Sequence, residues 1–329
     1  MDLYEETDPI YETKITPSFE PGEHKLYAAE YGSEDGVPVI CLHGGPGSPS
    51  SSIQRFFDPE YFRIIVPHQR GCGQSLPKGS LDANTPTHLV HDIRDILKAF
   101  DIDKAHIFGS SWGGTLALMY AQEYPDTINS LILSATPLWQ KDRIIAPAQN
   151  ALSSEAASDK NFVDHVRDDL DKDDPFSVFT AYHERIMSND ENISVPAARL
   201  YLQHDLEKVY GGAIDFDIND IPVDELLASM RIMLHFFDKH CYANDEDILA
   251  NADRLKNIPA TVFHGRNDEL VPYEEAEILA QLYGPGADLT INEGGHSTKS
   301  ESMMADLLNA TNKLAGNRQS GEGILSILK

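Results

Sequence analysis

Residues 109–113, Gly-Ser-Ser-Trp-Gly, match the pattern G-x-S-x-G with Ser111 at its centre. In this pattern a serine lies on a sharp turn between a strand and a helix, where its exposed hydroxyl can attack a carbonyl carbon. The flanking glycines leave room for the turn, and the following helix N-terminus favours developing negative charge. We therefore predict Ser111 as a nucleophile. Ser110 is a rival in the wrong place of the pattern, and a glycine-rich turn with an incidental serine is the alternative interpretation.

A serine nucleophile needs a base, and the base needs an acid that orients it. Asp268 and His296 follow the last two apolar runs of the chain. Groups at the carboxyl ends of parallel strands gather at one edge of a sheet, and the chain order serine, acid, histidine fits the strand–turn–helix pattern. We predict a triad of Ser111, His296 and Asp268, with Glu269 as the fallback acid. The alternatives are a helix cap for Asp268 and a surface position for His296.

A second glycine-rich turn, His-Gly-Gly-Pro-Gly at residues 43–47, follows an apolar run. Backbone N–H groups in such a turn can point at one spot. We predict an oxyanion hole made by the N–H of Gly45, or of Gly44 as the alternate donor, together with the N–H of Trp112. A phosphate-binding loop or a plain turn is the alternative, but no GxGxxG or Walker pattern stands here. We expect no cofactor and no metal.

These residues need a scaffold that brings them to one place. Short continuous apolar runs, typical of strands buried on both faces, recur along the chain. The predicted strands are 23–32, 37–42, 62–67, 105–108, 130–133, 260–264 and 288–291. Helical periods lie between them at 87–100, 115–123 and 273–282. The alternation predicts an α/β fold with a mostly parallel twisted sheet flanked by helices.

The alternation is interrupted between residues 138 and 256, where helical periods, prolines and many acids occur without strand-like runs. We predict a helical cap domain that is inserted between two strands and covers Ser111. The alternative is a long irregular loop, which is rare at this length. The predicted domains are a core, residues 1–137 and 257–329, and a cap, residues 138–256. The tail from Gly316 onward is predicted to be loose.

The charge and composition of the chain indicate which classes of binding partner to expect. The chain has 329 residues, with 26 Lys and Arg against 53 Asp and Glu, which gives a formal net charge of −27. Such a surface repels phosphate backbones and anionic membranes, so we expect neither a nucleic-acid nor a membrane partner. No apolar run reaches the ~18 residues of a membrane span, and the acidic N-terminus is unlike a secretory signal. The 3 scattered cysteines are typical of reduced thiols, so we expect a cytoplasmic protein.

Together these motifs resemble those of the proline iminopeptidases, serine peptidases of the α/β-hydrolase superfamily. The matching segments are 43–47, 55–59 with 61–64, 69–75, 84–85 with 89–93, and 109–118. The resemblance implies the α/β-hydrolase fold with a helical cap, and removal of an N-terminal proline or other small residue from a small peptide or amide through an acyl-enzyme. The alternative is an esterase, amidase or lactonase with an altered cap. A third class, a non-catalytic binding protein of this fold, usually lacks a triad residue.

Apart from one cap acid that is shorter by a methylene, the sequence departs from the family pattern at three positions. His68 stands where the family usually has Asp, and Ser134 where it often has Arg. In the family, two cap glutamates grip the free amine of the substrate, and Met233 occupies the place of the second. A methionine cannot pair with an ammonium ion. A preference for proline is therefore left open by the sequence.

The place of the first amine-binding glutamate falls on Asp205, one methylene shorter. The resemblance thus implies that Asp205 binds the substrate amine, with Glu207 and Glu184 as weaker candidates. The alternative is that Asp205 is one of many solvated acids of the cap.

Overall fold

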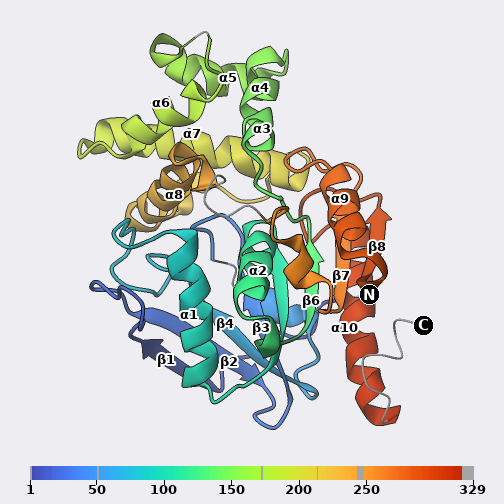
Figure 1. The fold of residues 1–329 in the computed structure, drawn as a ribbon. Coiled ribbons are helices and arrows are strands. Elements are labelled where there is room, and N and C mark those ends of the chain that lie inside the picture. Colours follow the sequence, from blue (N-terminus) through green and yellow to red (C-terminus); the bar gives the residue numbers. More distant parts are fainter. Residues whose placement is uncertain (1, 50–51, 172, 213, 243–247, 321–329) are drawn as a thin grey trace.

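The computed structural model describes residues 2–49, 52–171, 173–212, 214–242 and 248–320. Within these residues the strands form one sheet in the order β1-β2-β4-β3-β5-β6-β7-β8 (Figure 1). The strands are β1 (Tyr11–Ile15), β2 (Leu26–Gly32), β3 (Val37–Leu42), β4 (Phe62–Pro67), β5 (Ala105–Ser110), β6 (Ile128–Ser134), β7 (Ala260–Gly265) and β8 (Ala287–Asn292). β2 runs antiparallel to β1 and β4, and all other neighbours are parallel. The predicted α/β class with a mostly parallel sheet is confirmed.

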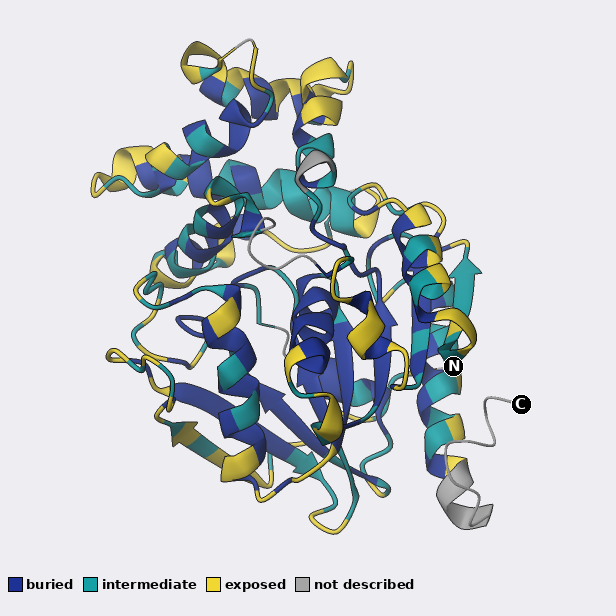
Figure 2. Ribbon diagram, viewed as in Figure 1, coloured by how far each residue is buried: buried dark blue, intermediate teal, exposed yellow. Residues whose placement is uncertain are grey.

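The central strands are buried on both faces, as their continuous apolar runs predict. In β3, Ile40 and Leu42 belong to one hydrophobic cluster, while Val39 and Cys41 belong to a second. Figure 2 shows these strands in the dark blue of buried residues, with exposed residues on the outer sides of the helices. The sheet therefore separates two apolar layers, each covered by helices.

The first cluster contains residues of α1 (Pro86–Ala99), α2 (Trp112–Glu123) and α9 (Glu274–Tyr283), and the second contains residues of α10 (Glu301–Ser320). The strand register aligns the carboxyl ends of the strands. Leu42 of β3 pairs with Gly109 of β5, and Gly265 of β7 pairs with Asn292 of β8. Loops that leave these strands consequently start at one edge of the sheet.

The chain between β6 and β7 is helical in the residues that the structure describes, and no strand occurs there. The helices are α3 (Lys141–Ile144), α4 (Ala146–Ser153), α5 (Ala157–Val166), α6 (Ser177–Ile186), α7 (Glu191–Tyr210) and α8 (Val223–Asp238). Figure 1 shows them gathered together on the side of the sheet toward which β6 and β8 point. The boundaries of a cap domain at 138 and 256 stay a prediction.

Two elements, β1 and α10, were not predicted from the sequence, and one expectation is wrong. β1 was not predicted, because it is an edge strand with mostly exposed residues and no apolar run. α10 extends to Ser320, so loose chain from Gly316 is wrong as far as that residue; the rest of the predicted loose tail lies outside the described residues.

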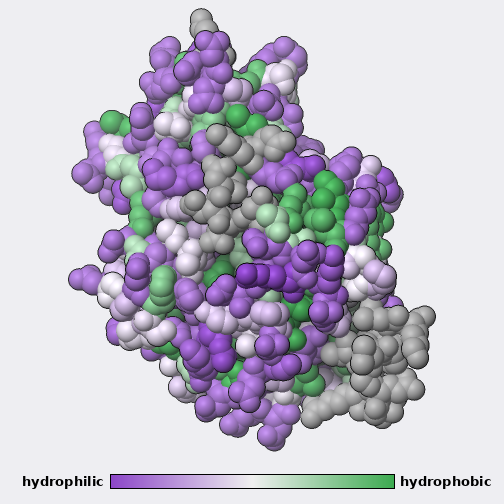
Figure 3. Space-filling view, in the orientation of Figure 1, coloured by the Kyte–Doolittle hydropathy of each residue, from purple (hydrophilic) through white to green (hydrophobic). Residues whose placement is uncertain are grey.

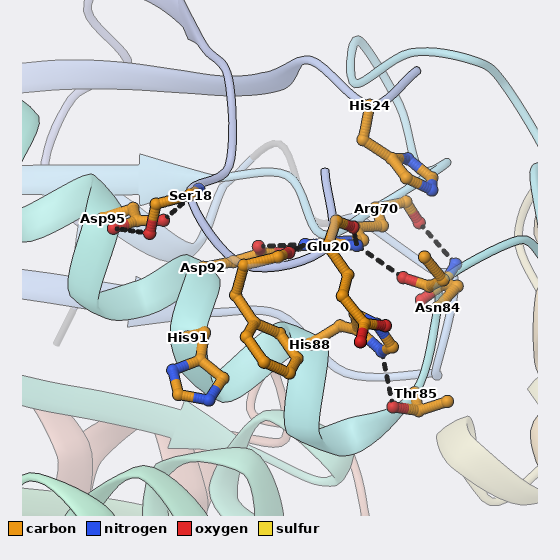
Figure 4. A network of polar contacts seen from close by, with 12 residues as sticks. Ser18, Glu20, His24, Arg70, Asn84, Thr85, His88, His91, Asp92 and Asp95 are labelled. Atoms are coloured by element: carbon orange, nitrogen blue, oxygen red, sulfur yellow. Dashed lines mark hydrogen bonds and ion pairs between the residues drawn. The ribbon is translucent and has the colours of Figure 1, made fainter. Parts of the chain in front are cut away.

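A buried ion pair anchors the loop after β4. The Arg70 guanidinium is fully buried and donates to both carboxylate oxygens of Asp92 in α1 over 2.8 Å each. It also donates to the backbone carbonyls of Phe19 and Glu20 over 3.0 Å each. Figure 4 shows this network between α1, the N-terminal segment and the loop. Removal of either partner would leave a buried charge unpaired, so the pair holds the loop in one position.

The surface matches the composition. The face drawn in Figure 3 is mostly hydrophilic, with smaller hydrophobic groups between. No helix in the described part of the chain is both long and apolar enough to cross a membrane.

Candidate active site

Ser111 lies at the turn between β5 and α2, with φ 55° and ψ −128°. A side chain in this left-handed region is strained, and such strain is typical of functional turns. Two glycines permit the turn: a Cβ at Gly109 would come within 2.3 Å of the Gly113 carbonyl oxygen, and one at Gly113 within 2.1 Å of the Leu42 carbonyl oxygen. The close approach of α2 to the end of β3 thus depends on glycine at position 113.

A chain of hydrogen bonds joins Ser111, His296 and Asp268. The Ser111 hydroxyl lies 2.9 Å from Nε2 of His296, and Nδ1 of His296 lies 2.8 Å from Oδ2 of Asp268. Because a carboxylate accepts, Nδ1 carries the proton and Nε2 is free to accept from the serine. This tautomer is the one in which a histidine acts as a base toward a serine hydroxyl.

The Asp268 carboxylate accepts hydrogen bonds on both oxygens. Oδ1 accepts from the backbone N–H groups of Leu270 and Val271 over 2.9 Å each, and Oδ2 accepts from His296 and, over 3.1 Å, from Nε2 of His264. Burial alone would raise the pKa of Asp268, but the positive charge of His296 and the hydrogen bonds from both histidines hold this pKa well below its usual range. Asp268 is therefore ionised at neutral pH.

Glu269, the fallback acid, lies elsewhere. Its carboxylate is 3.3 Å from the ammonium group of Lys208 and its side chain is half exposed. The structure brings Asp268, not Glu269, to His296.

A cavity of about 440 Å³ opens beside Ser111 and His296. Its wall includes Gly44 and Gly45 from the loop after β3, and residues of the helices between β6 and β7. Apolar side chains in the wall include Trp139, Leu202, Leu206, Val209, Met233 and Phe237. The cavity thus combines the candidate nucleophile with a mostly apolar enclosure, as small-molecule sites do.

Asp205 of α7 lines this same cavity and has no hydrogen bond or ion pair with any described residue that the structure records. Burial raises its pKa to about 6, and the nearby positive charge of His296 opposes that rise. In turn, burial would lower the pKa of His296, but Asp268 and then Asp205 raise it above the ordinary 6.5. An unpaired carboxylate therefore faces the cavity within electrostatic reach of the candidate base.

Glu207 and Glu184, the weaker candidates for binding the substrate amine, do not line the cavity. Glu207 accepts a hydrogen bond from the Gln203 amide over 2.6 Å, and Glu184 is exposed on α6. Met233 of α8 lies in the cavity wall.

The candidate oxyanion donors surround Ser111. A Cβ at Gly44 would lie 3.3 Å from Cβ of Ser111, Gly45 lines the cavity, and Trp112 begins α2 directly after the serine. In the described part of the chain, the N–H groups of Gly44, Gly45 and Trp112 donate to no backbone carbonyl. The three N–H groups therefore stay candidate donors to a substrate oxygen.

His68 and Ser134, the other two positions that depart from the family pattern, do not line the cavity. Nδ1 of His68 accepts the backbone N–H of Gln74 over 3.0 Å, and burial lowers the pKa of His68 to about 4. Ser134 is fully buried, 3.4 Å from the Met303 sulfur.

Sequence reasoning missed several polar residues at the site, among them Glu275 and Arg143 of the cavity wall, His264 and Gln69. His264 contacts Asp268 from the end of β7, and Gln69 bridges His43 and Trp112. The pattern His264-Gly265 at the end of a strand carries no sign of this contact. Gln69 lies in a matched family segment, but its partners are far away in the sequence.

Comparisons with known proteins show the family and the fold. A family model described as alpha/beta hydrolase fold matches residues 37–302. A proline iminopeptidase of Arabidopsis thaliana is 34% identical over 296 residues, which cover 88% of this chain and 77% of the relative. A proline iminopeptidase of Neisseria gonorrhoeae is 33% identical over 285 residues, 83% of this chain and 87% of the relative.

Among solved structures, a 2-hydroxy-6-oxo-6-phenylhexa-2,4-dienoate hydrolase from Rhodococcus sp. strain RHA1 superposes with a TM-score of 0.58 at 21% identity, covering 92% of this chain and 98% of that one. At this identity the likeness shows the fold alone.

Proposed function

Because this chain belongs to the proline iminopeptidase family of the α/β-hydrolase superfamily, we propose that it is a serine hydrolase that releases an N-terminal proline, or another small residue, from short peptides or amides. The observation that carries the proposal is the unpaired carboxylate of Asp205 in the cavity of Ser111. A buried ammonium ion needs a partner of opposite charge, and Asp205 supplies it.

The hydrogen bonds at the site support the following roles in catalysis. Ser111 Oγ attacks the carbonyl carbon while Nε2 of His296 takes its proton, and Asp268 holds the imidazole in that tautomer. The carbonyl oxygen becomes an oxyanion, which the N–H groups of Trp112 and of Gly45 or Gly44 stabilise. His296 then gives the proton to the leaving amine, and water hydrolyses the acyl-enzyme by the same steps.

Residues 138–256 serve as the cap in this proposal. Asp205 and Met233 reach the cavity from α7 and α8, so the helical insert determines which N-terminal residue fits. The cap also limits access of water to the reacting groups.

A second candidate function is hydrolysis of simple esters or amides that lack a free amine. Met233 favours it, because a cavity wall with Met233 in place of a carboxylate binds an ammonium ion less strongly than two carboxylates would.

One experiment separates the two functions. Proline β-naphthylamide and p-nitrophenyl acetate are assayed with the wild type, with Ser111→Ala and with Ser110→Ala. The aminopeptidase function predicts much higher kcat/KM on the prolyl amide, lost by several orders of magnitude in Ser111→Ala and kept within severalfold in Ser110→Ala. Turnover of the ester alone would favour the second function, and unchanged turnover in Ser111→Ala would reject both.

A further inference from the structure

Gln69 connects the two segments that carry the candidate oxyanion donors. Its side-chain oxygen accepts from Nε1 of Trp112 over 2.8 Å, and its side-chain nitrogen donates to the carbonyl oxygen of His43 over 2.9 Å. Its backbone N–H also donates to Nε2 of His43 over 3.1 Å. All three residues are buried, with exposed fractions of 8% for Gln69, 0% for Trp112 and 1% for His43.

The chemistry of the partners determines the orientation of this amide. An indole N–H can only donate and a carbonyl oxygen can only accept, so the Gln69 oxygen must face Trp112 and its nitrogen must face His43. Neither an acid nor a hydrocarbon of the same length would satisfy both partners. The bridge is thus specific for a primary amide.

The hydrogen bonds continue from His43 to Gly44. Because Nε2 of His43 accepts from Gln69, the proton of the neutral ring is on Nδ1, which lies 3.0 Å from the carbonyl oxygen of Gly44. Burial lowers the pKa of His43 to about 3, so the ring stays neutral at the pH of activity. An unbroken chain of bonds therefore runs from the Trp112 indole to the peptide group of Gly44.

The bridge is itself held in place. The adjacent Arg70 is fixed by its buried ion pair with Asp92, and the Asn84 amide donates to the Arg70 carbonyl over 3.1 Å (Figure 4). Backbone packing at Gly113 sets how closely α2 approaches the end of β3. The loop after β3 extends past that contact, and Gln69 is the side chain that joins this loop to the start of α2.

From this arrangement, and resting on the proposed function, we propose that Gln69 is a positioning residue of the oxyanion hole: by bridging His43 and Trp112 it sets the spacing of the N–H donors on either side of Ser111. Gln69 does not line the cavity, so it acts without touching the substrate. The oxyanion exists only in the transition state and the tetrahedral intermediate. If the N–H donors are no longer held at this spacing, kcat should therefore fall, whereas KM should stay nearly unchanged.

The test compares Gln69→Leu, which removes both side-chain bonds, and Gln69→Glu, which keeps only an acceptor for Trp112, with the wild type. Gln74→Leu is the matched control, because Gln74 lies in the same loop and is exposed. Thermal unfolding and circular dichroism identify which variants are folded. We expect kcat to fall roughly 10–100-fold in both Gln69 variants, by analogy with loss or misplacement of a single donor, while KM changes less than about twofold and Gln74→Leu behaves as wild type.

Inhibitor binding separates positioning from a merely structural role. Prolinal, an aldehyde, forms a tetrahedral adduct whose oxygen needs the donors, whereas the product proline does not. The affinity for prolinal should fall by the same factor as kcat, and the affinity for proline should not change. Any of three results in the Gln69 variants would overturn the proposal: an unchanged kcat, an equal loss of affinity for prolinal and proline, or a raised KM with unchanged affinity for prolinal.

The outcome does not depend on the substrate class. Ester hydrolysis also passes through an oxyanion, so the same loss of kcat is expected on p-nitrophenyl acetate if the wild type prefers esters. A wild type without prolyl-amide activity would therefore count against the proposed function, whereas a Gln69 variant with normal kcat on the better substrate would count against the positioning role.

Discussion

His264 donates to Oδ2 of Asp268 over 3.1 Å, between two side chains with no exposed surface. The donor is Nε2, because the same nitrogen lies 2.9 Å from the carbonyl oxygen of Val271, and both partners can only accept. Oδ2 is also the oxygen that accepts from His296. His264 therefore orients the carboxylate that in turn orients the candidate base.

We expect His264→Phe to lower kcat by about tenfold or more with little change in KM, since a hydrogen bond to a charged group contributes about 1.5–3 kcal/mol. Steady-state kinetics on the preferred substrate measures both constants. His264→Gln, which can still donate to Oδ2, should recover part of the lost kcat. Equal activity of the two variants would show that the contact does not matter for catalysis.

Asp205→Asn should raise KM for prolyl amides at least about tenfold, because the substrate ammonium loses a charged partner worth about 1.5–3 kcal/mol. Hydrolysis of p-nitrophenyl acetate, which has no amine, should hardly change. Glu207→Gln, on the same helix but outside the cavity wall, is the control and should leave both substrates unaffected. Equal effects of Asp205→Asn on amide and ester would contradict amine binding.

The pH profile should reflect both raised pKa values. His296 acts as a base only when neutral, and its pKa is raised above 6.5, so kcat/KM should fall as the pH drops through a midpoint above 6.5. Asp205 has a pKa of about 6, so KM for prolyl amides should rise further below that pH as its charge is lost. On the ester, Asp205→Asn should move the midpoint to lower pH, because the charge that raises the pKa of His296 is gone. A midpoint that stays in place would show that the two groups do not interact.

Asp92→Asn should destabilise the folded protein by about 3–5 kcal/mol, because it leaves the buried Arg70 charge without a carboxylate. Urea unfolding followed by circular dichroism measures this difference. The exposed Asp103→Asn serves as control and should change the free energy of unfolding by less than about 0.5 kcal/mol. A loss for Asp92→Asn as small as the control's would mean that the buried pair does not hold the loop.

Local patterns in the sequence were sufficient for the sheet and for the turn at Ser111. A strand buried on both faces requires a continuous apolar run, and such runs predicted the central strands β3 to β7. The strand at 23–32 was predicted from its turn with the next strand, and β8, at the edge of the sheet, is only partly buried although its sequence was interpreted in the same way. The two glycines around Ser111 are required because a Cβ at either position would come within 2.3 or 2.1 Å of a backbone carbonyl oxygen, so their spacing already indicated the turn. β1 carried no such run, because an edge strand needs only a neighbour to pair with.

The chain order of the predicted triad was also readable, since parallel strands place their following loops at one edge. The sequence could not distinguish Asp268 from Glu269 by type. The choice depends on backbone N–H groups of Leu270 and Val271, which hold one carboxylate toward His296 while Glu269 pairs with Lys208.

Only the tertiary structure decided which distant residues support the site. Gln69 and Trp112 are 43 positions apart, and no local periodicity relates them. Asp205 faces the cavity only because α7 packs above the sheet, and without that packing it would be one acid among the 53 Asp and Glu residues of the chain. Residue types and spacing determine local conformation, which depends on near neighbours. The partners of a buried amide, histidine or carboxylate depend on how whole elements pack, and that was decided only by the folded chain.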